Sequence, residues 1–139
     1  MTTPITVLAF DFGTQRIGVA VGSTITRSAR PLTTIDAPAG EARDVALSRL
    51  VAEWQPDLLV VGLPVHADGT PHPMTARARR FGEDLRDRFQ VPVDYADERY
   101  TSELATIALG GQGRKGRHKR DEVAAQIILQ GWLDDIRAA

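Results

Sequence analysis

The sequence predicts an α/β protein with a mixed sheet flanked by helices, in the element order β-β-β-α-β-α-β-α-α. Two observations carry this prediction. Up to residue 35, mostly apolar runs are joined by short polar links, which is typical of antiparallel strands. Beyond residue 40, helical apolar spacing alternates with short apolar runs, which is typical of strands connected through helices. The length of 139 residues suits a single domain spanning residues 1–139.

The chain is expected to begin with a β-hairpin. Residues 5–11 (ITVLAFD) and 16–22 (RIGVAVG) are mostly apolar, and the link Gly13-Thr14-Gln15 supplies a turn between them. A third strand is expected at 31–35, where β-branched side chains are frequent.

The pattern then changes to helical spacing. A helix is expected from residue 41 to 54, where apolar residues recur at i, i+3, i+4 and i+7. They are Leu47, Leu50, Val51 and Trp54. The breaker Gln55-Pro56-Asp57 ends this helix, and the continuous apolar run 58–63 predicts a strand buried on both faces. A second helix is expected at 74–89, with an inward face made of Met74, Ala78, Phe81 and Leu85.

The last third of the chain is expected to add one strand and two helices. The strand is predicted at 90–95, and Pro92 places it at a sheet edge or puts the proline at the start of the strand. A short helix is expected at 101–109. The final helix is expected at 121–136, and its inward residues are Val123, Ala124, Ile127, Ile128 and Leu133.

Composition excludes several classes of site. The chain has 17 basic and 18 acidic residues, a formal net charge of −1, and no cysteine. Disulfides, thiolate zinc sites and cysteine nucleophiles are therefore excluded. No apolar stretch reaches the roughly 18–20 residues of a membrane span, so we expect a soluble cytoplasmic protein with no membrane partner.

One segment is strongly basic despite the balanced total. Residues 111–120 (GQGRKGRHKR) contain five basic residues and no acid. These are Arg114, Lys115, Arg117, Lys119 and Arg120. The glycines predict a flexible loop, which could guide a phosphate backbone toward a site. A solvated surface loop explains the same composition.

Acidic residues stand at the ends of predicted elements. Asp11 closes the first strand, Asp97 and Glu98 follow the strand that ends near Tyr95, and Asp121 opens the last helix. In open α/β sheets, ligands bind beyond the carboxyl ends of strands. If these carboxylates converge, a divalent cation would relieve their repulsion, and Mg²⁺ or Mn²⁺ fits a site made only of oxygen ligands. Such a site could activate water for phosphodiester cleavage.

Each acid also has a purely structural explanation. Asp11 could bond backbone N–H groups of the turn that follows it. Asp121 could be a helix N-cap, for which Asp is a preferred residue type. Glu98 could pair with Arg99 or another surface base. Convergence in three dimensions decides between the two interpretations.

Four segments together resemble one known family. They are AFDFGTQRIGVAVG at 9–22, LLVVGLPVHADGT at 58–70, DERYTS at 97–102 and GRHKRDEVAAQIILQGWLDD at 116–135. In this order they resemble the YqgF/RuvX family, pre-16S ribosomal RNA nucleases with a ribonuclease H-like, Holliday-junction-resolvase-like fold.

The resemblance implies a set of site residues. Asp11, Glu98 and Asp121 would form a catalytic triad that binds Mg²⁺ or Mn²⁺, with Glu98 preferred over Asp97. Arg16 falls at the family's basic position after Asp-x-Gly-Thr, where Gln15 replaces the more familiar Lys. Arg16 and the five bases of 111–120 would position phosphates.

The implied function is hydrolysis of phosphodiester bonds during processing of the 5′ end of precursor 16S ribosomal RNA. Two alternatives remain at this stage. One is resolution of four-way DNA (Holliday) junctions, for which a homodimer would match a symmetric substrate better than a monomer. The other is a nucleic-acid-binding module without catalysis. Expected partners are therefore precursor ribosomal RNA and, in the first alternative, branched DNA.

Overall fold

The computed structural model describes residues 5–64, 68, 70, 72–97 and 114–138, with the backbone alone at 114–120, 137 and 138. Five strands form one sheet in the order β3-β2-β1-β4-β5. The elements are β1 (Thr6–Asp11), β2 (Ile17–Ser23), β3 (Ser28–Ile35), α1 (Glu41–Trp54), β4 (Leu58–Leu63), α2 (Thr75–Phe89), β5 (Val93–Asp97) and α4 (Arg114–Ala138). The predicted α/β class with a mixed sheet is confirmed.

The sheet is mixed because short turns join its first three strands and helices join the others. β1, β2 and β3 pair antiparallel, as hairpin connections require. β4 pairs parallel to β1, and β5 pairs parallel to β4. The carboxyl ends of β1, β4 and β5 therefore meet at one edge of the sheet.

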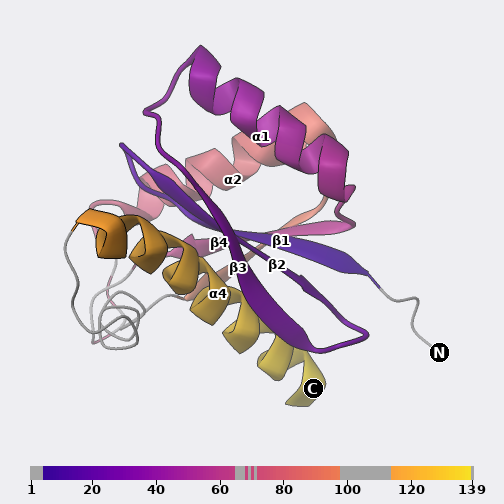
Figure 1. Ribbon diagram of the computed structural model, residues 1–139. Helices are drawn as coiled ribbons and strands as arrows, with labels where there is room; N and C mark the ends of the chain where they lie inside the picture. The colour runs from indigo at the N-terminus through magenta and orange to yellow at the C-terminus, as the bar shows by residue number, and fades with distance from the viewer. Residues whose placement is uncertain (1–4, 65–67, 69, 71, 98–113, 139) are drawn as a thin grey trace.

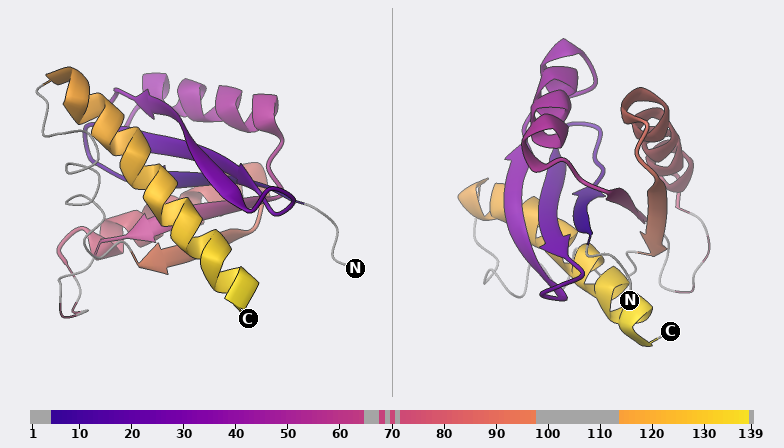
Figure 2. Two further views of the ribbon diagram at one scale, coloured as in Figure 1. Left: turned by 60° about the horizontal axis from the view of Figure 1, so that its bottom comes forward. Right: turned by 90° about the vertical axis from the view of Figure 1, so that its right-hand side faces the viewer.

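Helices cover both faces of this sheet (Figures 1 and 2). α1 and α2 lie on one face, over a core that includes Leu8, Phe10, Leu47 and Leu85. α4 crosses the other face alone and packs over a second cluster, which contains Val7, Ala9, Ala125, Leu129 and Leu133. Within the described part of the chain, no helix is both long and apolar enough to cross a membrane.

Small residues on β2 let α4 approach the sheet closely. Gly18, Ala20 and Gly22 alternate along the face of β2 that α4 covers. A Cβ atom on Gly22 would lie 3.0 Å from Cδ2 of Leu129. The backbone of α4 is thus held against the central strands, which fixes the helix relative to the end of β1.

Most predicted elements agree with the structure, and three have clearly different bounds. α1 and β4 have the expected bounds, and β5 lies at a sheet edge directly after Pro92. β3 begins at Ser28 rather than at 31 because its first residues pair with the end of β2. Asp97 is the last residue of β5, not a residue beyond it. The helix predicted at 101–109 lies outside the described residues.

The final helix begins at Arg114 rather than at Asp121. Residues 114–120 are therefore helical and not the predicted loop. Arg and Lys are good helix formers, and Gly116 costs about 1 kcal/mol in a helix interior, which is not enough to end one. Asp121 accordingly lies inside α4, so the N-cap explanation for this acid is wrong.

Candidate nuclease site at the end of β1

Asp11 and Asp121 approach each other through Gly18. Asp11 is the last residue of β1 and pairs with Gly18 across the antiparallel ladder. The backbone of Asp121 lies against Gly18, where an added Cβ atom would be 1.9 Å from the Asp121 carbonyl oxygen. Paired residues in such a ladder have Cα atoms about 4.5–5.5 Å apart. Asp11 and Asp121 are thus both direct neighbours of Gly18, at the carboxyl edge of the sheet.

The alternation of β1 puts Asp11 on the same face as α4. Val7 and Ala9 belong to the cluster under α4, whereas Leu8, Phe10 and Phe12 belong to the cluster under α1 and α2. Because successive strand residues point to opposite faces, Asp11 points to the same face as Val7 and Ala9. The structure therefore brings together two of the three acids of the triad that the resemblance implies.

Arg16 forms an ion pair with Asp121. The Nε atom of Arg16 donates a hydrogen bond of 2.8 Å to Oδ2 of Asp121. The two side chains are 26% and 16% exposed, so the ion pair is only partly open to solvent. Arg16 was predicted to contact phosphate, and the bond to Asp121 engages its Nε group rather than its two terminal Nη groups.

Glu122, the acid next to Asp121, points elsewhere. Its Oε1 atom accepts a hydrogen bond of 3.3 Å from the hydroxyl of Thr34 on β3. Neighbouring residues on a helix lie about 100° apart around its axis, which explains this divergence. Glu122 is therefore directed toward β3 rather than toward Arg16.

Asp97 lies on the opposite face of the sheet from Asp11. Val93 and Tyr95 pack with the cluster under α1 and α2, while Ala96 packs on the α4 side. By the same alternation, Asp97 points to the same face as Tyr95, which is the face that α2 covers. Glu98 itself lies outside the described residues.

The donors that are described suit a hard divalent cation. Asp11 and Asp121 offer carboxylate oxygens at one edge and on one face of the sheet, and Mg²⁺ and Mn²⁺ prefer such ligands. Within the described ranges, no group of three His, Cys, Asp or Glu residues is arranged to hold a metal ion. The two acids thus suit a divalent cation as a pair of ligands, and the described residues add no third acid to them.

Sequence reasoning missed Arg43, which holds the loop after Asp11. This arginine is only 4% exposed. It donates hydrogen bonds to the backbone carbonyls of Ala37 (2.7 Å), Gly13 (2.9 Å) and Thr14 (3.2 Å). Burial lowers the pKa of Arg43 from its usual value. The sequence signal that could have identified Arg43 is its position four residues before Leu47, on the apolar face of the predicted helix.

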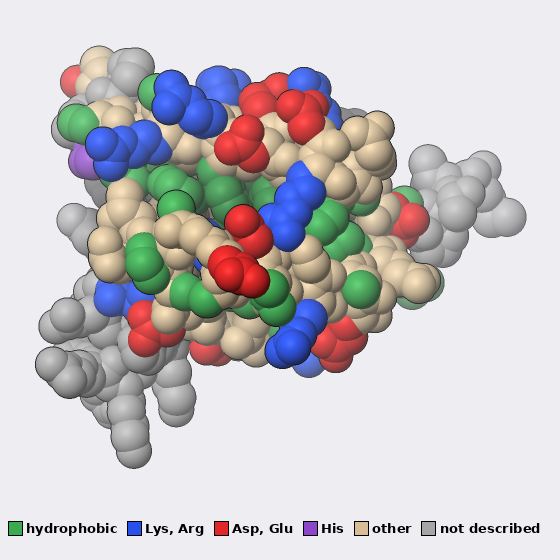
Figure 3. Space-filling view, turned by 90° about the horizontal axis from the view of Figure 1, so that it is seen from above, with side chains coloured by type: hydrophobic (Ala, Val, Ile, Leu, Met, Phe, Trp, Pro, Cys, Tyr) green, Lys and Arg blue, Asp and Glu red, His purple; other side chains and the backbone are tan. Residues whose placement is uncertain are grey.

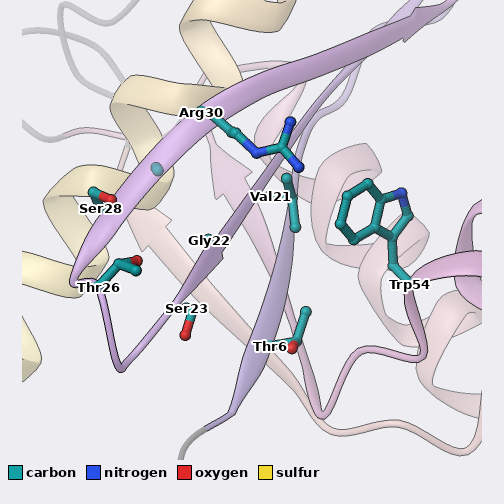
Figure 4. Close-up of a pocket in the computed structure, with 9 residues that line it drawn as sticks. Thr6, Val21, Gly22, Ser23, Thr26, Ser28, Arg30 and Trp54 are labelled. Atoms are coloured by element: carbon teal, nitrogen blue, oxygen red, sulfur yellow. The ribbon is translucent and has the colours of Figure 1, made fainter.

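A cavity of about 360 Å³ lies at the other end of the sheet. Figure 4 shows it beside the start of β1, with the guanidinium of Arg30 turned toward Trp54. The centre of the Trp54 ring is 5.3 Å from Cζ of Arg30. The length of β1, from Thr6 to Asp11, separates this cavity from the acids by about 17 Å. It therefore takes no part in the site at the carboxyl edge.

Comparison with known proteins gives a consistent family assignment. The model of the family described as "RuvX: Holliday junction resolvase" matches residues 5–135. A protein of Dechloromonas aromatica (strain RCB) named "Putative pre-16S rRNA nuclease" is 58% identical over 132 residues, covering 93% of this chain and 90% of the relative. A protein of the same name from Burkholderia cenocepacia (strain HI2424) is 51% identical over 134 residues, covering 94% and 90%.

Solved structures share the fold at low sequence identity. Thermus thermophilus RuvC in complex with a Holliday junction matches with a TM-score of 0.58 at 16% identity, over 96% of both chains. The yeast mitochondrial Holliday junction resolvase Ydc2 matches with a TM-score of 0.54 at 12% identity, over 91% of this chain and 77% of that one. The fold is therefore ribonuclease H-like, of the type found in RuvC-like resolvases.

Proposed function

The chain belongs to the RuvX family of Holliday junction resolvases, and from this premise we propose that it is a divalent-metal-dependent nuclease that processes the 5′ end of precursor 16S ribosomal RNA. One observation carries the proposal. Asp11 and Asp121, far apart in sequence, meet through Gly18 at the carboxyl edge of the sheet. The names of the similar proteins support RNA as the substrate.

Three acids would hold the metal. Asp11 and Asp121 lie on the α4 side of the sheet, and Glu98 is proposed as the third ligand because Asp97 is turned toward α2. A bound Mg²⁺ or Mn²⁺ supplies an activated water and stabilises the leaving oxygen of a phosphodiester. Because α4 is held against Gly18, the distance between Asp11 and Asp121 is set by packing rather than by flexible loops.

Arg16 would orient the phosphate that is cleaved. Its Nε group is bonded to Asp121, and this bond fixes the guanidinium beside the acids. The Nη groups of such an anchored arginine can donate to a phosphate oxygen without the Nε bond being broken. Arg16 is thus proposed to hold Asp121 in place and to contact substrate.

The basic amino-terminal part of α4 would bind the flanking phosphates. Arg114, Lys115, Arg117, Lys119 and Arg120 all precede Asp121 on the same continuous helix. The positions of Arg114 and Arg117 lie seven and four residues before Asp121, so they belong to one stripe of α4. A phosphate backbone bound along this stripe would be led to the acids, and the affinity would fall with rising salt.

A four-way DNA junction is the second candidate substrate, favoured by the family description and by the shared fold with RuvC. The test compares a precursor RNA, with a duplex and single-stranded flanks, against a mobile four-way DNA junction. Each is incubated with Mg²⁺, Mn²⁺ or a chelator. We expect metal-dependent cleavage that is faster on RNA and is abolished by Glu98→Gln. Faster cleavage of the junction would make resolution the function, and binding without cleavage of either would leave a binding module.

A further inference from the structure

A groove runs between α1 and α2, and the proposed nuclease site does not account for it. The cavity in this α1–α2 groove has a volume of about 350 Å³, and its apolar lining includes Phe12, Leu47, Phe81 and Leu85. The rings of Phe12 and Phe81 lie 4.9 Å apart between centroids. Figure 3 looks onto this face and shows a hollow with apolar side chains at its floor and both basic and acidic side chains around it.

The charged lining of the groove is mainly basic. Four arginines and two aspartates line it, which gives 4 − 2, or a net charge of +2. They are Arg43, Arg77, Arg80, Arg88, Asp44 and Asp84. This excess favours an anionic occupant.

Two of the arginines make no polar contact with the described residues. Arg43 is bonded to backbone carbonyls, and Arg88 pairs with Asp44 at 3.2 Å. Arg77 and Arg80 are exposed, and with the described residues they form no hydrogen bond or ion pair. Because both side chains are exposed and line the cavity, a ligand that enters the groove can reach their guanidinium groups.

The groove opens near the same edge of the sheet as the proposed nuclease site, but on the opposite face. Phe12 directly follows Asp11, and Thr14 of the same loop also lines the cavity. Arg43 holds this loop by bonding the carbonyls of Gly13 and Thr14. An RNA strand that passes over Asp11 would therefore reach the groove by bending around the carboxyl edge of the sheet, past the loop that begins with Phe12.

We infer that the α1–α2 groove binds a single-stranded segment of the RNA substrate that bends around the carboxyl edge of the sheet from the phosphate that is cleaved. A base would rest on the apolar floor against Phe12 or Phe81, and Arg77 and Arg80 would contact the adjacent phosphates. Aromatic surfaces combined with basic side chains are the usual means of binding single strands. This inference rests on the proposed nuclease function, because the acids define where the strand runs.

The size of the groove favours a single strand over a duplex. Pockets for small molecules measure about 300–1,000 Å³, and 350 Å³ is near the lower end of that range. The groove can therefore enclose one unpaired nucleotide. A base pair is about twice as wide as a single base and would not fit.

The test measures RNA binding in the presence of EDTA, so that cleavage plays no part. Fluorescence anisotropy compares a blunt RNA hairpin with the same hairpin carrying a single-stranded flank. We expect Arg77→Gln/Arg80→Gln to reduce affinity for the flanked hairpin about tenfold and to leave the blunt hairpin unchanged. The slope of log affinity against log salt should fall by about 1.4, which corresponds to two lost contacts to a single strand.

A matched control removes the same charge elsewhere. Arg49 and Arg86 are exposed residues of α1 and α2 that do not line the groove. Arg49→Gln/Arg86→Gln should retain the wild-type difference between the two hairpins. Phe81→Leu tests the floor without removing charge, and we expect it to weaken the flanked complex about tenfold.

Three results would overturn the inference. The flank could add no affinity to the wild type, or both double variants could lose the same affinity for both hairpins. Alternatively, sedimentation could show a wild-type dimer that Arg77→Gln/Arg80→Gln separates, in which case the groove is covered by a second copy. All three results are measured in the absence of metal, where no cleavage occurs. Failure of the nuclease proposal would be seen in a different experiment, as absence of cleavage by the wild type in the presence of metal.

Discussion

Gly18 of β2 and Asp121 of α4 touch through their backbones, so closely that a Cβ atom on Gly18 would lie 1.9 Å from the carbonyl oxygen of Asp121. Gly18 also pairs directly with Asp11. A single glycine therefore sets the distance between the two acids proposed to bind metal. The packing of α4 and the geometry of the site depend on the same contact.

Gly18→Ala is predicted to lower both stability and cleavage. The new methyl group would meet backbone atoms of Asp121 and Glu122, so α4 must move as a whole. Overpacking of this kind costs about 1–3 kcal/mol, and we expect a loss of at least about 2 kcal/mol in the free energy of unfolding. Urea denaturation measures the loss, and cleavage at saturating Mn²⁺ measures the displacement of Asp121.

The control for this variant is Gly131→Ala in the same helix. A Cβ atom at Gly131 would meet nothing within 4 Å. Replacement of a helical glycine by alanine should therefore raise stability by about 0.5–1 kcal/mol and leave cleavage unchanged. Equal stability of the Gly18→Ala variant and the wild type would show that α4 does not press on Gly18.

Arg16→Gln is predicted to change metal binding and cleavage in opposite directions. Loss of the guanidinium removes a positive charge from Asp121, so Mn²⁺ should bind about fivefold more tightly, equivalent to about 1 kcal/mol. Cleavage should nevertheless fall, because the phosphate loses a donor. Isothermal titration with Mn²⁺ and single-turnover kinetics separate the two effects. Weaker metal binding in this variant would contradict the proposed role.

Arg43→Ala is predicted to destabilise the protein by about 2–4 kcal/mol. Three backbone carbonyls lose their donor, and a side chain that is only 4% exposed is removed from its packed position. Arg43→Lys should recover little, because one ammonium group cannot reproduce the planar set of donors. Arg49→Ala, an exposed change on the same helix, should stay within about 0.5 kcal/mol of the wild type in urea denaturation. A mild Arg43→Ala phenotype would mean that the loop does not need this anchor.

Tyr95 should ionise only at unusually high pH. Burial raises the pKa of Tyr95 to about 12, and the hydrogen bond that its hydroxyl donates to Glu83 adds to the shift. Because the pKa in the folded protein exceeds the usual 10.0, this group contributes stability below pH 10 that is lost between pH 10 and about 12. Tyrosinate absorbance in a Tyr100→Phe background would measure the shift. Glu83→Gln should move the pKa of Tyr95 back toward 10, and an unchanged value would exclude Glu83 as a cause.

Local patterns were sufficient to predict most of the fold. The helical spacing at 41–54 and the apolar run at 58–63 both matched the structure. The segment Gln55-Pro56-Asp57 separates them, so the end of the helix and the start of the strand could be read from the sequence. The predicted start of α4 was wrong because a run of glycine and basic residues is also typical of loops. What continues this helix is the favourable helix propensity of Arg and Lys, which outweighs the cost of Gly116.

The candidate site was only partly predictable, because convergence is a property of packing. Asp11 could be placed at a strand end from the sequence, but its neighbour Asp121 is brought to it by the small size of Gly18. The ion pair between Arg16 and Asp121 joins residues 105 positions apart, and no local pattern encodes it. Glu98 lies outside the described residues, so its assignment stays a prediction.

The central claim is that Asp11 and Asp121 act together through a bound divalent metal ion. Its most direct test is single-turnover cleavage of a labelled precursor 16S RNA fragment in Mn²⁺ by the wild type, Asp11→Asn and Asp121→Asn, with Asp97→Asn as the matched control. We predict that the first two variants fold normally and lose more than about a hundredfold in rate, while Asp97→Asn retains its activity. Wild-type rates in Asp11→Asn, or undiminished cleavage in the presence of a chelator, would contradict the claim.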